Sequence, residues 1–62
     1  MSPARLIAEI RQAMPDRLDY LERRAKLTPM SEPDRAAVKA ELAKRRDYFN
    51  SPEYRLALAR TL

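Results

Sequence analysis

The chain has 62 residues, a formal net charge of +4, and no cysteine, histidine or glycine. A chain of this length forms one small domain with a marginal core, and the missing residue types exclude disulfides, the usual zinc sites and glycine-rich phosphate loops. The excess of 13 basic over 9 acidic residues also argues against a mimic of DNA, which would have to be acidic.

The first predicted helix begins at Ser2 and Pro3, which suit the N-cap and the first helical position. Apolar residues then recur every three or four positions, the spacing of one helix face. This stripe comprises Ile7, Ile10, Met14, Leu18, Leu21 and Ala25, with Leu6 and Leu27 at its edges.

Pro15 interrupts this stripe, because proline in a helix interior costs about 3 kcal/mol. Two interpretations stay open. In one, a short helix ends near Ala13 and a second begins at Pro15. In the other, a single kinked helix spans about residues 3–27. The stripe keeps its phase across Pro15, which a true break has no reason to preserve, so we favour the kinked helix.

The segment from Thr28 to Pro33 contains two prolines in six residues and predicts a short, stiff turn. Short connections make neighbouring helices antiparallel, so the expected unit is a helical hairpin with Met30 filling its turn end.

The clearest helix covers residues 32–49. Ser31 is a good N-cap, Pro33 falls in the first turn, and the acidic side chains of Glu32 and Asp34 favour the positive end of the helix dipole. One face of this helix carries Val38, Leu42, Arg45 and Phe49.

A short last helix is expected over residues 52–60. Asn50 is a candidate for a left-handed helix end, Ser51 for the next N-cap and Pro52 for the first helical position. A helix of about ten residues is not stable alone, so it must pack on the hairpin or on a partner chain.

The predicted fold is therefore all-α: an antiparallel helical hairpin, with its first helix kinked or broken near Pro15, plus a short C-terminal helix. Two packed helices cannot enclose all the large apolar residues, so a homodimer is the expected way to complete the core. The residues assigned to the core or to the dimer contact are Ile7, Ile10, Met14, Leu18, Leu21, Val38, Leu42 and Phe49.

The sequence offers little for catalysis, because both histidine and cysteine are missing. The serines precede helix starts, where capping explains them. Carboxylates such as Asp19 and Glu22 stand four residues before Arg23 and Lys26, as in exposed helical ion pairs. We expect no enzyme activity, no cofactor and no metal site.

Arg23-Arg24 and Lys44-Arg45-Arg46 lie near the ends of the two long helices, which point in opposite directions in a hairpin, so the groups do not merge within one monomer. Favourable placement of cations at helix C-termini explains them, and recognition of phosphate or of an acidic protein surface is the alternative. Tyrosine and arginine are enriched at binding hot spots. The candidate partner-binding residues are Tyr48, Arg45, Arg46, Arg24 and Tyr20, with Tyr48 the first choice.

The leading functional hypothesis is a small bacterial or phage regulator that binds another protein and modulates or inhibits it, as a homodimer. The alternative is a basic regulator that binds DNA or RNA, for which a helix-turn-helix could be drawn from Ala40 to Leu62. That turn lacks the usual glycine, and the second helix offers only arginines for base edges. A third hypothesis is a structural subunit of a larger assembly. No apolar run is long enough for a membrane span and no signal peptide is evident, so a cytoplasmic location is expected.

Overall fold

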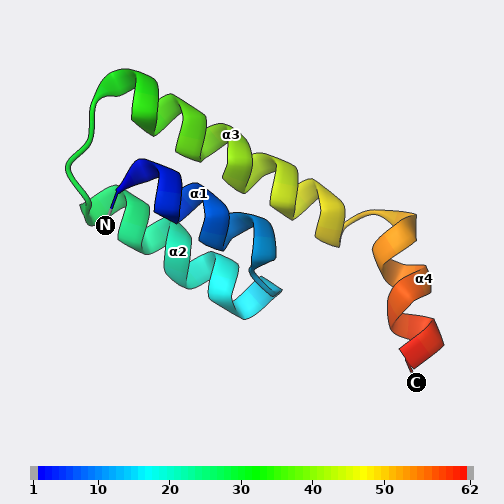
Figure 1. Ribbon diagram of the computed structural model, residues 1–62. Helices are drawn as coiled ribbons and strands as arrows, with labels where there is room; N and C mark the ends of the chain where they lie inside the picture. Colours follow the sequence, from blue (N-terminus) through cyan, green and yellow to red (C-terminus); the bar gives the residue numbers. More distant parts are fainter. Residues whose placement is uncertain (1, 62) are drawn as a thin grey trace.

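The computed structural model describes residues 2–61, in which there are four helices and no strand: α1 (Pro3–Gln12), α2 (Pro15–Leu27), α3 (Glu32–Phe49) and α4 (Pro52–Thr61). The all-α fold class is confirmed. Helices α1, α2 and α3 lie side by side, and α4 turns away from the end of α3 (Figure 1). The molecule is elongated, with principal extents of 41 × 16 × 15 Å.

The favoured single kinked helix over residues 3–27 is wrong, because the chain breaks before Pro15. Ala13 and Met14 are extended, with ψ angles of 141° and 165°. A proline disfavours helical angles in the residue before it, and it is well accommodated at the first position of the next helix. Helix α2 consequently runs back along α1 in the opposite direction (Figure 1).

The apolar stripe gave the wrong prediction because its three- and four-residue spacing does not continue through the break. Ala13 is buried there, whereas Met14, which the stripe placed in the core, is 57% exposed. Leu27, at the edge of the predicted stripe, is also exposed. Each helix instead has its own buried face, and the reversal between them brings these two faces onto the same core.

The serine caps are confirmed. The hydroxyls of Ser2, Ser31 and Ser51 each accept a hydrogen bond from the backbone N–H three residues later, at 3.3 Å. The expected left-handed end at Asn50 is wrong, since its φ is −95° and ψ is 1°. Its N–H donates to the carbonyls of Arg46 and Asp47, so the last turn of α3 tightens without a positive φ.

A core of eight buried residues joins the first three helices. The second half of the predicted long helix supplies the third side that a two-helix hairpin lacks. Ile7, Phe49 and Met30 are partly buried against this core. The core comprises Leu6, Ile10, Ala13, Leu18, Leu21, Ala25, Val38 and Leu42.

Helix α4 stands apart from this core. It contacts only α3, and none of its described residues is buried. Over residues 2–61, no helix combines the length and the apolar character that crossing a membrane requires.

Candidate functional site

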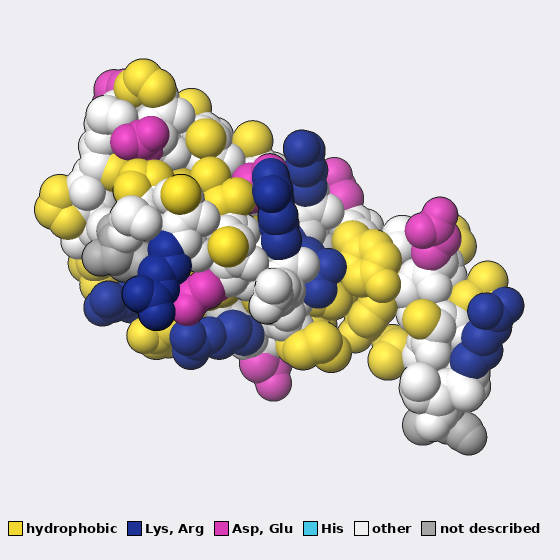
Figure 2. Space-filling model, viewed as in Figure 1, with side chains coloured by type: hydrophobic (Ala, Val, Ile, Leu, Met, Phe, Trp, Pro, Cys, Tyr) yellow, Lys and Arg dark blue, Asp and Glu magenta, His cyan; other side chains and the backbone are white. Residues whose placement is uncertain are grey.

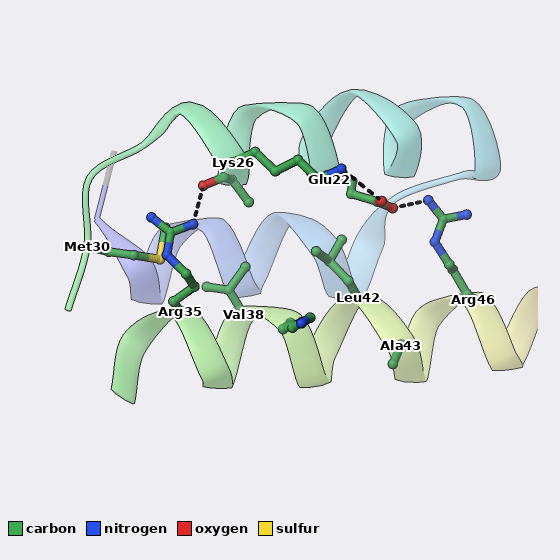
Figure 3. Close-up of a pocket in the computed structure, with 10 residues that line it drawn as sticks. Glu22, Lys26, Met30, Arg35, Val38, Leu42, Ala43 and Arg46 are labelled. Carbon is green, nitrogen blue, oxygen red and sulfur yellow. Dashed lines mark hydrogen bonds and ion pairs between the residues drawn. The ribbon is translucent and has the colours of Figure 1, made fainter. Parts of the chain in front are cut away.

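A groove of about 390 Å³ lies between α2 and α3. Figure 3 shows it with α1 behind, Val38 and Leu42 extending from α3 toward α2, and Met30 at one end. Ala25 and Ala43 complete the apolar lining. These two alanines have short side chains, which leaves room between the helices.

Charged side chains surround this apolar lining. Four of them are basic and one is acidic, a net charge of +3 for the rim of the groove. They are Glu22, Lys26, Arg35, Lys39 and Arg46.

One end of the groove is closed by an ion-pair network between α2 and α3. Arg46 of α3 contacts Glu22 and also lies 3.1 Å from Asp19, both on α2 (Figure 3 draws the Glu22 contact). These two hydrogen bonds raise the pKa of Arg46 above its ordinary value. Asp19 therefore pairs with Arg46 rather than with the predicted Arg23, while the predicted Glu22–Lys26 pair is present at 4.0 Å.

At the other end, Arg35 of α3 holds the C-terminus of α2. Its guanidinium donates to the carbonyl of Ala25 at 3.2 Å and to that of Thr28 at 3.1 Å. The last carbonyls of a helix have no partner within the helix and carry partial negative charge, so a cation is favourable there. Arg35 thus fixes the α2–α3 turn, and no carboxylate forms an ion pair with it among the described residues.

Arg45, a predicted partner-binding residue, is partly buried and bonded within the chain. Its Nε donates to the carbonyl of Ala13 at 3.0 Å, in the break between α1 and α2. Its guanidinium carbon also lies 5.0 Å from the ring centroid of Tyr48 and 4.7 Å from that of Phe49. Arg45 therefore connects the end of α1 to the aromatic residues at the end of α3.

Three aromatic rings meet where α3 passes into α4. The centroids of Phe49 and Tyr54 are 4.8 Å apart in an edge-to-face arrangement, and Tyr48 lies 5.5 Å and 5.4 Å from them. Such pairs add about 1 kcal/mol to the burial of their surfaces. Phe49 and Tyr54 thus pack α4 onto the end of α3, and Tyr48 remains exposed beside them.

A second, smaller hollow lies on the opposite side of α3, and it contains a bidentate ion pair. Arg11 of α1 donates to Glu41 of α3 through Nε at 3.2 Å and through a terminal nitrogen at 3.0 Å. This hydrogen bond and the charge of Arg11 hold the pKa of Glu41 below its ordinary value of 4.5. Lys44, 3.8 Å from the same carboxylate, acts in the same direction.

The structure does not bring the five predicted partner-binding residues together. Arg45 and Arg46 serve contacts within the chain, and only Arg46 lines the groove. Tyr20 and Arg24 are exposed on α2 and line neither hollow; Arg17 lies over the Tyr20 ring at 4.4 Å.

The groove residues that sequence reasoning missed are Lys39, Arg35 and the small Ala43. The spacing of Arg35, Lys39 and Arg46 on one helix side, next to the Val38–Leu42 face, was a signal that could have indicated them.

Within residues 2–61, no three acidic, histidine or cysteine side chains cluster in a way that could hold a metal ion. Comparison of the chain with protein families, with curated proteins and with solved structures gives no match in any of the three.

Proposed function

We propose that this chain is a non-enzymatic helical interaction module, which binds another protein as a homodimer and modulates or inhibits it. The observation that carries the proposal is the amount of apolar side chain left outside the core on one small helix. Leu56 and Leu58 of α4 are 56% and 46% exposed, and no described residue of α4 is buried.

The location of this apolar surface supports a contact between chains. Figure 2 shows hydrophobic side chains at the junction of α3 with α4 and along α4 itself, which projects from the body of the molecule. A projecting helix of about ten residues gains little stability from its own hydrogen bonds. Packing against α4 of a second copy would bury the face that carries Leu58 and stabilise the helix, so we place the dimer contact there.

The lack of histidine, of cysteine and of any glycine-dependent loop favours binding over catalysis. We place this basic chain in the cytoplasm of bacteria or of phage-infected cells, as expected from its sequence.

A nucleic-acid regulator is the second candidate, and one observation favours it. Arg55 and Arg60 are both exposed on α4, the helix that projects from the body. Phosphate groups attract such side chains regardless of sequence. Nucleic-acid binding would leave the adjacent leucines without a role, because a phosphate backbone offers no apolar surface to cover them.

The test is a pull-down from a lysate of the source cells with the tagged chain, with and without nuclease. The proposal predicts a specific protein that is retained after nuclease treatment. A Leu58→Glu bait should capture less of it, because a chain that no longer dimerises presents one copy of its partner surface instead of two. Leu27→Glu is the matched control, because Leu27 is 79% exposed at the far end of α2. Nucleic acid in the untreated eluate, with no protein after nuclease, would favour the second candidate.

A further inference from the structure

We propose that the groove between α2 and α3 binds an acidic amphipathic helix of the partner protein. This inference rests on the proposed function and assigns to it the partner's chemistry and binding site. It separates two surfaces: α4 for the second copy of the chain, and the groove for the partner.

The shape of the groove fits one side of a helix. Its α3 wall runs from Arg35 to Arg46, a rise of about 16 Å or about three helical turns. Met30, Val38 and Leu42 provide the apolar floor that receives side chains spaced three and four residues apart, as when an amphipathic helix lies in a hydrophobic groove.

The charges of the rim indicate which charge the partner should carry. Glu22 is already engaged by Arg46 and Lys26, whereas Lys39 and Arg35 have no carboxylate ion-pair partner among the described residues. Carboxylates along the edges of an incoming helix would complement this net +3 rim. The groove therefore selects a helix that is apolar on one face and acidic beside it.

The same charges argue against a second copy as the occupant of the groove. The chain has a net charge of +4, and its projecting helix carries Arg55 and Arg60 against the single acid Glu53. Inserting α4 of a second copy would bring like charges together. Nucleic acid would satisfy the cations, but it would leave the apolar floor without a partner, so the combination favours an acidic protein helix.

The experiment uses the full-length chain, isotope-labelled for NMR, and three synthetic peptides of about 15 residues, long enough to span the groove. The first peptide is an amphipathic Leu/Ala/Glu helix. The second has Lys in place of Glu, and the third has the composition of the first in an order without amphipathic spacing. We expect the first alone to shift the methyl signals of Met30, Val38 and Leu42, while those of Leu56 on α4 stay unchanged.

Lys39→Glu and Lys44→Glu are the paired variants, with Lys44 on the same helix but outside the groove. We expect Lys39→Glu to weaken binding of the acidic peptide by about tenfold and Lys44→Glu to leave it within about twofold. Circular dichroism of both variants checks that each remains folded.

Three results would overturn the inference. These are no groove shifts with the acidic peptide at about 1 mM, equal shifts with the basic or reordered peptide, or groove shifts with a single-stranded oligonucleotide that match those of the acidic peptide. A lysate protein captured equally by wild type and Lys39→Glu would also reject the groove as its binding site, while leaving the proposed function intact. Groove binding of the acidic peptide without any captured protein would instead count against the proposed function.

Discussion

At the scale of single residues, Arg45 shows how a side chain that looks available for a partner is used within the chain. Its place on an apolar helix face made it a candidate for partner binding. In the fold, its guanidinium reaches the Ala13 carbonyl and lies near two aromatic rings. Sequence could not reveal this, because the Ala13 carbonyl becomes free only when the chain breaks before Pro15.

We predict that Arg45→Met destabilises the chain by about 1–2 kcal/mol, because it leaves the Ala13 carbonyl without its donor in a partly buried position. Lys44→Met is the control, since Lys44 is exposed at the position just before Arg45 on α3. Urea unfolding of both variants, followed by circular dichroism, measures the difference. Equal stabilities would show that the Arg45 hydrogen bond contributes nothing.

The Arg11–Glu41 pair predicts a pH dependence. The pKa of Glu41 is lowered in the folded chain, so its contribution to stability is present above its ordinary pKa of 4.5 and is lost as pH falls through the lower folded value. We expect the difference in Tm between wild type and Glu41→Gln to shrink between about pH 6 and about pH 2. Thermal melts across this range measure it; a constant difference would contradict the assignment.

At the scale of elements, the sequence predicted helices and caps well and the break before Pro15 poorly. Serine caps and first-turn prolines act locally, so residues such as Ser31 and Pro33 identify a helix start without knowledge of the fold. Whether Pro15 kinks or ends a helix depends on how much apolar surface is buried when the chain reverses direction there. Here the reversal places Ile10 and Leu21 in one core with Val38, and spacing along the chain does not report such a distant contact.

We predict that Pro15→Ala leaves α1 and α2 as separate helices. Joining them would move Leu6 and Ile10 away from the core, and losing a buried Leu or Ile side chain costs about 2–3 kcal/mol. That loss exceeds the gain from restoring helical bonds at two residues. Backbone chemical shifts of Ala13 and Met14 give the answer: extended values are expected, and helical values at both would contradict this account.

At the scale of the whole molecule, the core is closed within one chain, and α4 is the helix that offers apolar surface to a second copy. Two helices could not close the core, but three helices do, and Leu21 and Leu42 are now buried within one chain. A charge at either position would unfold a monomer as readily as a dimer, so such a variant cannot test association. Helix α4 carries Leu58 outside the core and has no buried residue among its described ones, so it offers apolar surface for a contact between chains.

The candidate groove could not be predicted from the sequence either, because it depends on how the helices pack. Its two walls come from α2 and α3, and its open side exists because α1 packs on the other side of both (Figure 3). Sequence patterns indicated that Val38 and Leu42 face a neighbouring helix. They did not indicate that Lys39 and Arg35 would stand beside an opening.

The most direct test of the account is sedimentation equilibrium of wild type, Leu58→Glu and Leu27→Glu over a range of concentrations. We predict a wild-type dimer, a folded Leu58→Glu monomer, and a Leu27→Glu dimer like wild type, because Leu58 belongs to the proposed α4 contact and Leu27 does not. A wild-type chain that stays monomeric at every concentration, or a Leu58→Glu variant that dimerises as tightly as wild type, would contradict it.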